Sequence, residues 1–478
     1  MQNTLPDLGF MPAYVIVGLG ILYFFLFKGV PLFKKISPAV VFFIMLIGAF
    51  FSEYCLGSVN RSLFFNMVQI DSYSVLFNQI FYLTAGATVL MMWKSPEMSE
   101  DTKWESMGLL GTILLGMMFM ASTKNLLMSV VAFELVSIPS YLFVGMNRIN
   151  KVSKEAALKY VLFGAFSTGL MLYGMSLLFG LTGALDFTYI WGHLGEPTIL
   201  GSPVYFLAIL LTLGGMTFKV AAVPFHFWCP DAYQTAPTPI TAFLSVAPKV
   251  AGFALIMRFL SGHLTTHTAH LTTILSVIAI LTMTIGNLSA LKQTDIKRLL
   301  AYSSIAHAGY LLMGVAVLTH EARQLVFFYI IIYMIMNLAA FMGIAYLSEG
   351  RKFQIDSFKG IVTQKPLLVV GLGICFFSLA GIPPFAGFIG KFYLFKIVIE
   401  KEMFLLAIIA GINSVISLYY YVNVLKVMII DKSDQAISLP KWDRLPVGFV
   451  TLSAIPLLLF GVYWRPLLQW VDLMLPFK

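Results

Sequence analysis

Five lysines lie inside long apolar stretches of the chain, where a charged side chain is costly. They are Lys159, Lys219, Lys249, Lys391 and Lys396. Ionisable side chains at membrane depth usually face an internal path for ions or protons. Burial and a neighbouring carboxylate act on an amine in opposite directions, so such a lysine can gain and lose a proton. These residues predict an ion path through a membrane.

The centre of this path is expected between Gly214 and Lys249. Lys219 precedes Pro224 by five residues, and Lys249 lies near the middle of the next apolar segment. Proline removes a backbone donor and breaks a helix, so the segment that carries Lys219 is expected to be interrupted. Both lysines are predicted to lie too deep for their ammonium groups to reach the membrane surface.

A carboxylate and an ammonium group precede this centre. Glu134 lies near the middle of one apolar segment, and Lys159 lies one turn into the next. Because paired charges are less costly to bury than lone ones, we interpret them as an ion pair whose separation changes the field at a nearby base. The alternatives are a hydrogen-bonded carboxylic acid at Glu134 and a Lys159 side chain that extends to the membrane surface.

Three further groups could extend the path. Lys391 follows a Pro-Pro break and could carry a proton, or could instead satisfy carbonyls that the break leaves free. His226 and His307 titrate near neutral pH and could pass protons between lysines, or could be packing residues. Lys396, nearer the end of its segment, is expected to extend to the surface.

Other site chemistries find no support in the sequence. The three cysteines, Cys55, Cys229 and Cys375, are far apart and predict neither a disulfide framework nor a metal site. His263, His267 and His270 have helical spacing, but they lie among threonines in a polar link, and no metal is expected there. The glycines before Lys391 do not match a phosphate-binding loop. No cofactor, nucleotide or nucleic acid is therefore expected in this chain.

The composition indicates an all-α polytopic membrane protein. Of 478 residues, 59% are hydrophobic and 11% are charged, whereas soluble domains carry roughly 25% charged residues. Apolar runs of this length cannot be strands of a membrane barrel, so they are expected to be helices. About fourteen runs are long enough to span a bilayer. They lie near 9–27, 37–57, 72–93, 104–122, 125–146, 155–182, 203–228, 238–260, 268–290, 298–318, 322–347, 366–399, 402–430 and 446–468.

The distribution of positive charge predicts the orientation. Nineteen of the 31 lysines and arginines lie in the loops after odd-numbered spans, and seven lie on the other side. Cytoplasmic loops carry the excess of Lys and Arg, so both termini are predicted to lie on the outer side of the membrane. The same rule explains the net charge of +9 without a nucleic-acid partner.

Helix breakers at two corresponding places predict an internal repeat. The seventh span contains VPFHFWCP, and the twelfth contains LAGIPPFAGFIGKF. Paired broken helices of opposite direction are typical of inverted-topology repeats with the ion site at the breaks. We therefore predict spans 1–3 in residues 1–103, two inverted five-helix repeats in 104–262 (helices 4–8) and 263–430 (helices 9–13), and a last helix in 431–478.

Four runs of sequence resemble the antiporter-like membrane subunits of respiratory complex I. They are EAALKYVLFGAFSTGLMLYG, LGGMTFKVAAVPFHFWCPDAYQTAPTPITAFLSVAPK, GNLSALKQTDIKRLLAYSSIAHAGYLLMG and SLAGIPPFAGFIGKFYLF. They resemble the sixth, the seventh and eighth, the ninth to tenth, and the twelfth helices of that family. The resemblance covers roughly residues 100–430, and motifs of this length are specific.

Within the family the chain is most similar to the N-type subunits of bacterial NADH–quinone oxidoreductase. Tyr233 stands where M- and D-type subunits tend to have histidine, and Lys391 stands where M-type subunits tend to have glutamate. The sequence also lacks the long lateral helix that L-type subunits carry after the last span. Cys229 departs from the Thr or Leu of the family, which is a small change in packing.

The resemblance implies a role for each buried charge. Glu134 and Lys159 would form the charge pair, Lys219 would be the central proton carrier, Lys249 the relay and Lys391 the exit-side carrier. His226 and His307 match the hydrophilic axis of the family. The complex would use NADH, FMN, iron–sulfur clusters and a quinone in other subunits, and K-type and M-type subunits would be the neighbours. The implied location is the bacterial cell (inner) membrane.

Three other interpretations stay open from the sequence. The first is a D-type subunit of a multisubunit cation/proton antiporter, or the related subunit of a membrane-bound hydrogenase. The second is a membrane cytochrome with His226 and His307 as haem ligands, although the sequence shows no paired geometry for them. The third is a purely structural anchor subunit, against which the five lysines at span depth argue.

Overall fold

The structure is a computed structural model. It describes residues 9–27, 37–56, 60–147, 150–194, 202–265, 269–348, 353–432 and 444–475. Nearly all of this part of the chain is helical, and one short antiparallel hairpin pairs β1 (Arg61–Leu63) with β2 (Val68–Ile70). The chain divides into two compact units, Met1–Val220 with Thr235–Thr268, and Ala221–Gln234 with Ala269–Lys478.

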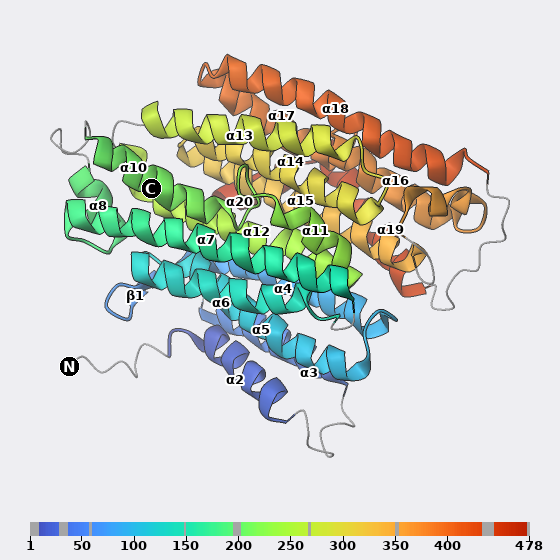
Figure 1. Cartoon of the computed structure of the whole chain (residues 1–478), viewed down its shortest axis with the longest axis horizontal. Coiled ribbons are helices and arrows are strands. Elements are labelled where there is room, and N and C mark those ends of the chain that lie inside the picture. Colours follow the sequence, from blue (N-terminus) through green and yellow to red (C-terminus); the bar gives the residue numbers. More distant parts are fainter. Residues whose placement is uncertain are drawn as a thin grey trace. The chain divides into compact units, whose positions relative to one another are not determined.

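The first unit is a bundle of long helices in which sequence neighbours pack together. In Figure 1, α5, α6 and α7 run side by side in blue to green, and α2 lies against α5. Its helices are α2 (Pro12–Leu26), α3 (Pro38–Leu56), α4 (Ser72–Lys94), α5 (Glu100–Ser122), α6 (Leu126–Val144), α7 (Lys151–Thr182), α8 (Phe187–Leu194), α10 (Pro203–Thr217) and α12 (Thr238–Phe259), followed by the 3-10 turn η2 (Leu260–Thr265).

The second unit is also helical, and α13 packs along α14 through most of its length (Figure 1). Its long helices are α13 (Ala269–Ala290), α14 (Ile296–Ala316), α15 (His320–Leu347), α16 (Pro366–Ala380), α17 (Ala386–Glu400), α18 (Phe404–Ile429) and α19 (Arg444–Val462). The shorter elements are most of α11 (Trp228–Thr235), the 3-10 turns η3 (Ile355–Phe358) and η4 (Ile361–Thr363), and α20 (Arg465–Met474).

The apolar helices confirm a multi-pass membrane protein. Within the described residues, 11 helices are long and apolar enough to cross a bilayer. Three shorter apolar helices, α2, α10 and α16, cover three more of the segments expected from the sequence. The number fourteen stays a prediction, because a helix of 15 residues is about 22 Å long and is shorter than the usual span.

The two predicted helix breaks are present, and the first begins earlier than expected. Helix α10 ends at Thr217, so Lys219 lies just beyond the helix rather than inside it. Ala221 then takes a left-handed conformation with φ 57°, and Pro224 follows, so the helix cannot continue. In the second unit α16 ends at Ala380 and is capped by Gly381, and α17 begins at Ala386.

The last predicted span is shorter than the sequence suggested. Helix α19 ends at Val462, and α20 begins separately at Arg465 with Pro466 in its first turn. Proline is favoured at the start of a helix, because the backbone N–H groups of the first turn have no intrahelical acceptor and proline therefore loses no hydrogen bond there. The run 446–468 is therefore two helices, and only the first of them is long enough to span.

Candidate ion path

Lys219 is buried and has defined partners in the first unit. Its side chain is 1% exposed, and its Nζ donates to Ser137 Oγ at 2.6 Å. The ammonium also lies 4.3 Å from the centre of the Phe133 ring, a distance that gives a favourable cation–π contact. Both partners belong to α6. This helix therefore supplies a polar and an aromatic contact that hold the amine just after α10 ends.

Glu134 lies on the same helix, within electrostatic range of Lys219. Its Oε1 accepts a hydrogen bond from Thr168 Oγ1 of α7 at 2.6 Å. Lys159 of α7 forms an ion pair with Glu155, one turn earlier, at 2.8 Å, and 43% of its side chain is exposed. This geometry fits a lysine that reaches toward the surface. The predicted pairing of Glu134 with Lys159 stays a prediction.

Lys249 lies on the most deeply buried helix of the first unit. Every residue of α12 is buried, and Lys249 is 2% exposed. Three residues further on, Gly252 lets the backbone that carries Lys219 approach closely. A Cβ at Gly252 would lie 2.8 Å from Val220 Cγ1 and 3.1 Å from Lys219 Cβ. The chain therefore brings the segments of Lys219 and Lys249 into direct contact.

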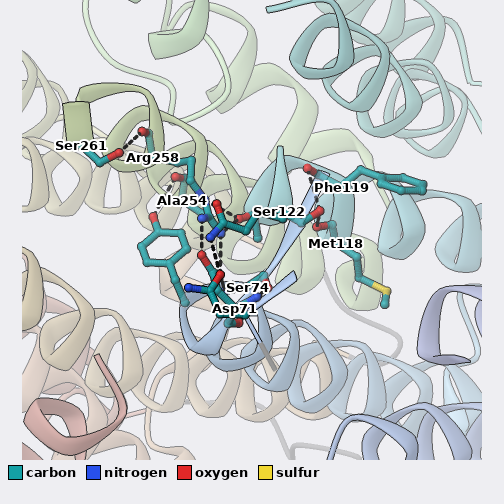
Figure 2. A network of polar contacts seen from close by, with 12 residues as sticks. Asp71, Ser74, Met118, Phe119, Ser122, Ala254, Arg258 and Ser261 are labelled. Carbon is teal, nitrogen blue, oxygen red and sulfur yellow. Dashed lines mark hydrogen bonds and ion pairs between the residues drawn. The ribbon is translucent and has the colours of Figure 1, made fainter. Parts of the chain in front are cut away.

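One end of α12 is fixed by a buried ion pair, which Figure 2 shows. Arg258 Nη1 and Nη2 donate to the two carboxylate oxygens of Asp71 at 2.6 and 2.8 Å. The same guanidinium donates to the Ala121 carbonyl at the end of α5 and lies 4.5 Å from the centre of the Tyr73 ring. Tyr73 in turn donates to the Ala254 carbonyl of α12. Helix α12 is thus joined to α4 and α5.

The other end of α12 is fixed by a carboxylate from the α4–α5 loop. The cap residue Pro237 offers no side-chain hydrogen bond to the helix N-terminus. Glu97 fills this role, because it accepts from the backbone N–H and the hydroxyl of Thr238, each at 2.7 Å. A negative charge at a helix N-terminus is favourable. The segments at the two ends of α4 therefore hold the two ends of the helix that carries Lys249.

In the second unit, His226 lies in the irregular segment that follows Pro224. It is 5% exposed, and its ring contacts that of Phe227. Nearby, Cys229 Sγ lies 4.0 Å from Ser304 Oγ of α14, a distance at the limit of a hydrogen bond to sulfur. Asp231 pairs with Arg298 at 2.6 Å and ties α11 to α14.

His307 is the centre of a polar cluster on α14. Its Nδ1 lies 2.7 Å from Tyr329 Oη, and its Nε2 lies 3.3 Å from Tyr421 Oη. Tyr421 also shares a hydrogen bond with Ser303. With a hydroxyl on each ring nitrogen, His307 can accept a proton on one side while it gives one up on the other.

Lys391 takes part in the second helix break. Its Nζ donates to the carbonyls of Leu379 and Ala380, each at 3.0 Å. These carbonyls belong to the last turn of α16, where a helix leaves acceptors without an intrahelical partner. The amine lies 4.7 Å from the centre of the Tyr310 ring, and that ring also contacts His307. Lys391 therefore satisfies freed carbonyls and lies one aromatic ring away from the histidine cluster.

Several polar residues that contact the buried lysines and His307 were not predicted from the sequence. Ser137 has no charge to mark it. Tyr329 and Tyr421 belong to α15 and α18, whereas His307 belongs to α14. A second cluster joins Asn287 to Asn413 at 3.1 Å and to Tyr420 at 3.0 Å. Asparagines inside apolar spans were a usable signal, because such residues are costly to bury without partners. The tyrosines gave no such signal among 21 in the chain.

No metal site is evident in the part of the chain that the structure describes. It contains no group of three or more His, Cys, Asp or Glu side chains placed to hold an ion. Of the three histidines weighed in the sequence, His267 and the side chain of His263 lie outside the described residues.

Fold and buried charges together define a polytopic membrane protein with charged and polar side chains buried inside each unit, and comparison with known proteins gives its family. Residues 123–417 match the family described as "NADH:quinone oxidoreductase/Mrp antiporter, TM". The chain belongs to this family. The resemblance seen in the sequence is confirmed over most of the range expected.

Curated relatives and solved structures agree with this assignment. NADH-quinone oxidoreductase subunit N of Anaeromyxobacter sp. (strain Fw109-5) is 39% identical over 443 residues, which cover 86% of this chain and 85% of the relative. A chain of respiratory complex I from Thermus thermophilus with bound aureothin has a TM-score of 0.81 and 28% identity, over 96% of this chain and 98% of that one. A chain of the Mrp complex from Dietzia sp. DQ12-45-1b shares the fold alone, with a TM-score of 0.81 and 18% identity over 98% and 97%.

Proposed function

We propose that this chain is a proton-translocating membrane-arm subunit of an NADH–quinone oxidoreductase. The observation that carries the proposal is the buried Lys219, whose ammonium group contacts a hydroxyl and an aromatic face and interacts electrostatically with the Glu134 carboxylate. A buried amine with a nearby acid can exist in both protonation states and change between them when the local field changes. The match to the quinone oxidoreductase and antiporter family supports the same function.

The proposed mechanism moves protons and no electrons through this chain. Quinone reduction elsewhere in the complex changes the distance between the Glu134 carboxylate and the Lys159 ammonium, and so changes the proton affinity of Lys219. A proton then passes to Lys249, through His307 with its two tyrosine partners, to Lys391 on the exit side. His226 is a further relay in this proposal. NADH, FMN, the iron–sulfur clusters and the quinone belong to other subunits in this proposal.

The proposed partners and location follow from the same assignment. The neighbours would be the K-type and M-type subunits of the membrane arm, in the inner membrane of a bacterial cell. Both chain termini would lie on the outer side.

The test is proton pumping by the reconstituted complex with Lys219→Ala. Loss of the central carrier is expected to lower the number of protons moved per electron. The proton-transfer rate is expected to fall by roughly tenfold or more. Lys396→Ala is the matched control, because this lysine is half exposed and pairs with Glu400 on its own helix. Unchanged proton-to-electron stoichiometry with Lys219→Ala would rule out the relay.

A second candidate is a D-type subunit of a multisubunit cation/proton antiporter, or the related subunit of a membrane-bound hydrogenase. The family description names the Mrp antiporters beside the quinone oxidoreductases, and this supports the second candidate as well as the first. Purification in mild detergent separates the two. An NADH-oxidising arm with flavin supports the oxidoreductase, and a set of antiporter subunits without such an arm supports the second candidate.

A further inference from the structure

A buried carboxyl group lies outside the matched region, in the first three long helices. Glu53 belongs to the last turn of α3 and is 7% exposed. Its Oε1 accepts a hydrogen bond from Asn78 Nδ2 of α4 at 2.6 Å. Within the part of the chain that the structure describes, Glu53 Oε2 and Asn78 Oδ1 are buried without a hydrogen-bond partner. Two neighbouring acceptors therefore lack a donor.

An ionised Glu53 would be poorly compensated at this place. No ion pair joins it to a lysine, arginine or histidine among the described residues. The C-terminal end of a helix carries the negative end of the helix dipole, which disfavours a carboxylate in the last turn of α3. An unpaired buried carboxylate is unfavourable, because the charge loses its hydration and gains no compensating partner.

A small cavity borders the carboxyl group. Its lining consists of Phe10 to Tyr14 at the start of α2, together with Glu53, Ile70 and Val75. These residues belong to one end of the unit, where α2 begins, α3 ends and α4 begins. The cavity thus lies between Glu53 and the residues at this end of the bundle, and this is the side from which we expect a proton to enter.

We propose that Glu53 is a proton-binding site, separate from the lysine path, that exchanges its proton with water at the end of the bundle where α2 begins. Protonation of Oε2 forms an O–H bond, removes the charge and turns an acceptor without a partner into a donor. On release the O–H bond breaks, the proton passes to water, and Asn78 Nδ2 still holds the ionised group through Oε1. The proposal does not rest on the function proposed for the whole chain.

The groups around Glu53 determine how such a site responds to pH. The titratable groups that interact with Glu53 are Tyr14 and Tyr82, and Arg258 in turn interacts with Tyr14. The guanidinium of Arg258 is engaged by both oxygens of Asp71. Tyrosines stay neutral in the physiological range, so Glu53 is the member of this group expected to exchange a proton there.

The experiment is infrared difference spectroscopy of the purified full complex between acidic and alkaline pH. A protonated carboxyl group gives a C=O stretching band that carboxylates lack. Loss of one such band in Glu53→Gln, but not in Asp101→Asn, is the expected result. Asp101 is the matched control, because it is an exposed carboxylate of the same unit. Asn78→Ser, which removes the donor to Oε1, should shift the band without abolishing it.

Two results would overturn the proposal. One is a spectrum of Glu53→Gln that keeps every carboxyl band of the parent complex. The other is a band that appears only when sodium is replaced by choline, because Glu53 would then hold a monovalent cation rather than a proton. If Glu53→Gln fails to assemble, the position of the carboxyl C=O band in Asn78→Ser is the test of the proposal. An unchanged position of this band would contradict it.

Discussion

The two best-defined buried lysines are held by different kinds of partner. Lys219 donates to a serine hydroxyl and faces a phenylalanine ring, whereas Lys391 donates to two backbone carbonyls at a helix end. A hydroxyl can also donate, so the Lys219 amine keeps a partner in both protonation states. The carbonyls of Leu379 and Ala380 accept only, and they favour the charged form of Lys391.

Ser137→Ala tests the partner of Lys219. Removal of the hydroxyl leaves the buried ammonium without this acceptor, at a cost of about 1–3 kcal/mol to the charged form. We expect slower proton translocation, with a smaller loss than in Lys219→Ala. Ser140→Ala is the control, since this buried serine lies on the same helix and bonds only to the Val136 carbonyl. Equal proton-pumping rates in the two serine variants would contradict the assignment.

Gly381→Ala tests the second helix break. Gly381 has φ 84°, and a Cβ there would lie 2.8 Å from Lys391 Cδ. We expect a destabilisation on the order of 1–2 kcal/mol, together with reduced proton pumping, because the lysine must move. Gly373→Ala on the same helix is the control, since its nearest neighbour would be 3.8 Å away. The thermal midpoint of the purified complex and the pumping ratio are the measurements, and matching values for both variants would refute the expectation.

At the scale of elements, α12 is held by polar contacts at both of its ends. Asp71 caps α4 and, through Arg258, holds one end of α12, while Glu97 caps the other end. The two polar contacts oppose a slide of α12 along α4. In the proposed relay, Lys249 would therefore keep its place in the first unit while its protonation state changes.

Asp71→Asn isolates the charge of this anchor. Asparagine keeps the helix cap that Asp71 gives to Ser74 N, but it removes the charge opposite Arg258. Loss of one member of a buried ion pair is expected to cost about 3 kcal/mol of stability. Thermal unfolding of the complex measures it. Ser74→Ala, which removes only the reciprocal hydroxyl of the cap, should cost less, and the reverse order would exclude an ion-pair anchor.

The cost of Asp71→Asn should depend on pH. Burial alone would raise the pKa of Asp71, but the charge and hydrogen bonds of Arg258 lower it below the usual value. A lowered folded-state pKa means that the carboxylate stabilises the fold fully above the unfolded pKa of about 4, and that this stabilisation is lost as pH falls through the folded value. The difference in thermal midpoint between the parent and Asp71→Asn should be constant near neutral pH and shrink below about pH 4. A difference that grows toward acid pH would contradict the ion pair.

At the scale of the whole molecule, orientation is the property that the charge distribution predicts. We expect both termini on the outer side, because the loops after odd-numbered spans carry 19 of the 31 Lys and Arg residues. In a variant without native cysteines, Gln2→Cys should react with a membrane-impermeant maleimide in intact cells, and Lys94→Cys should react only after lysis. The opposite labelling pattern would reverse the predicted orientation.

Much of the fold could be read from the sequence, because a bilayer allows few solutions. Long apolar runs must be helices there, and prolines at Pro224 and Pro384 must interrupt them. What could not be read was where a break begins. Helix α10 ends before Lys219, because the left-handed residue Ala221 stops the helix ahead of the proline. Alanine has the highest helix propensity, so the residue type at position 221 did not predict a left-handed conformation.

The sequence by itself determined the class of protein and the charged residues of the candidate path, because buried Lys, Glu and His are rare enough in apolar segments to stand out. Only the tertiary structure decided their partners. Ser137 with Lys219, the tyrosines with His307, and Asp71 with Arg258 come from segments 82, 22, 114 and 187 residues apart. Such contacts depend on which helices pack together. The hydrophobic periodicity of one helix shows which of its faces is buried, but it does not identify the helix that packs against that face.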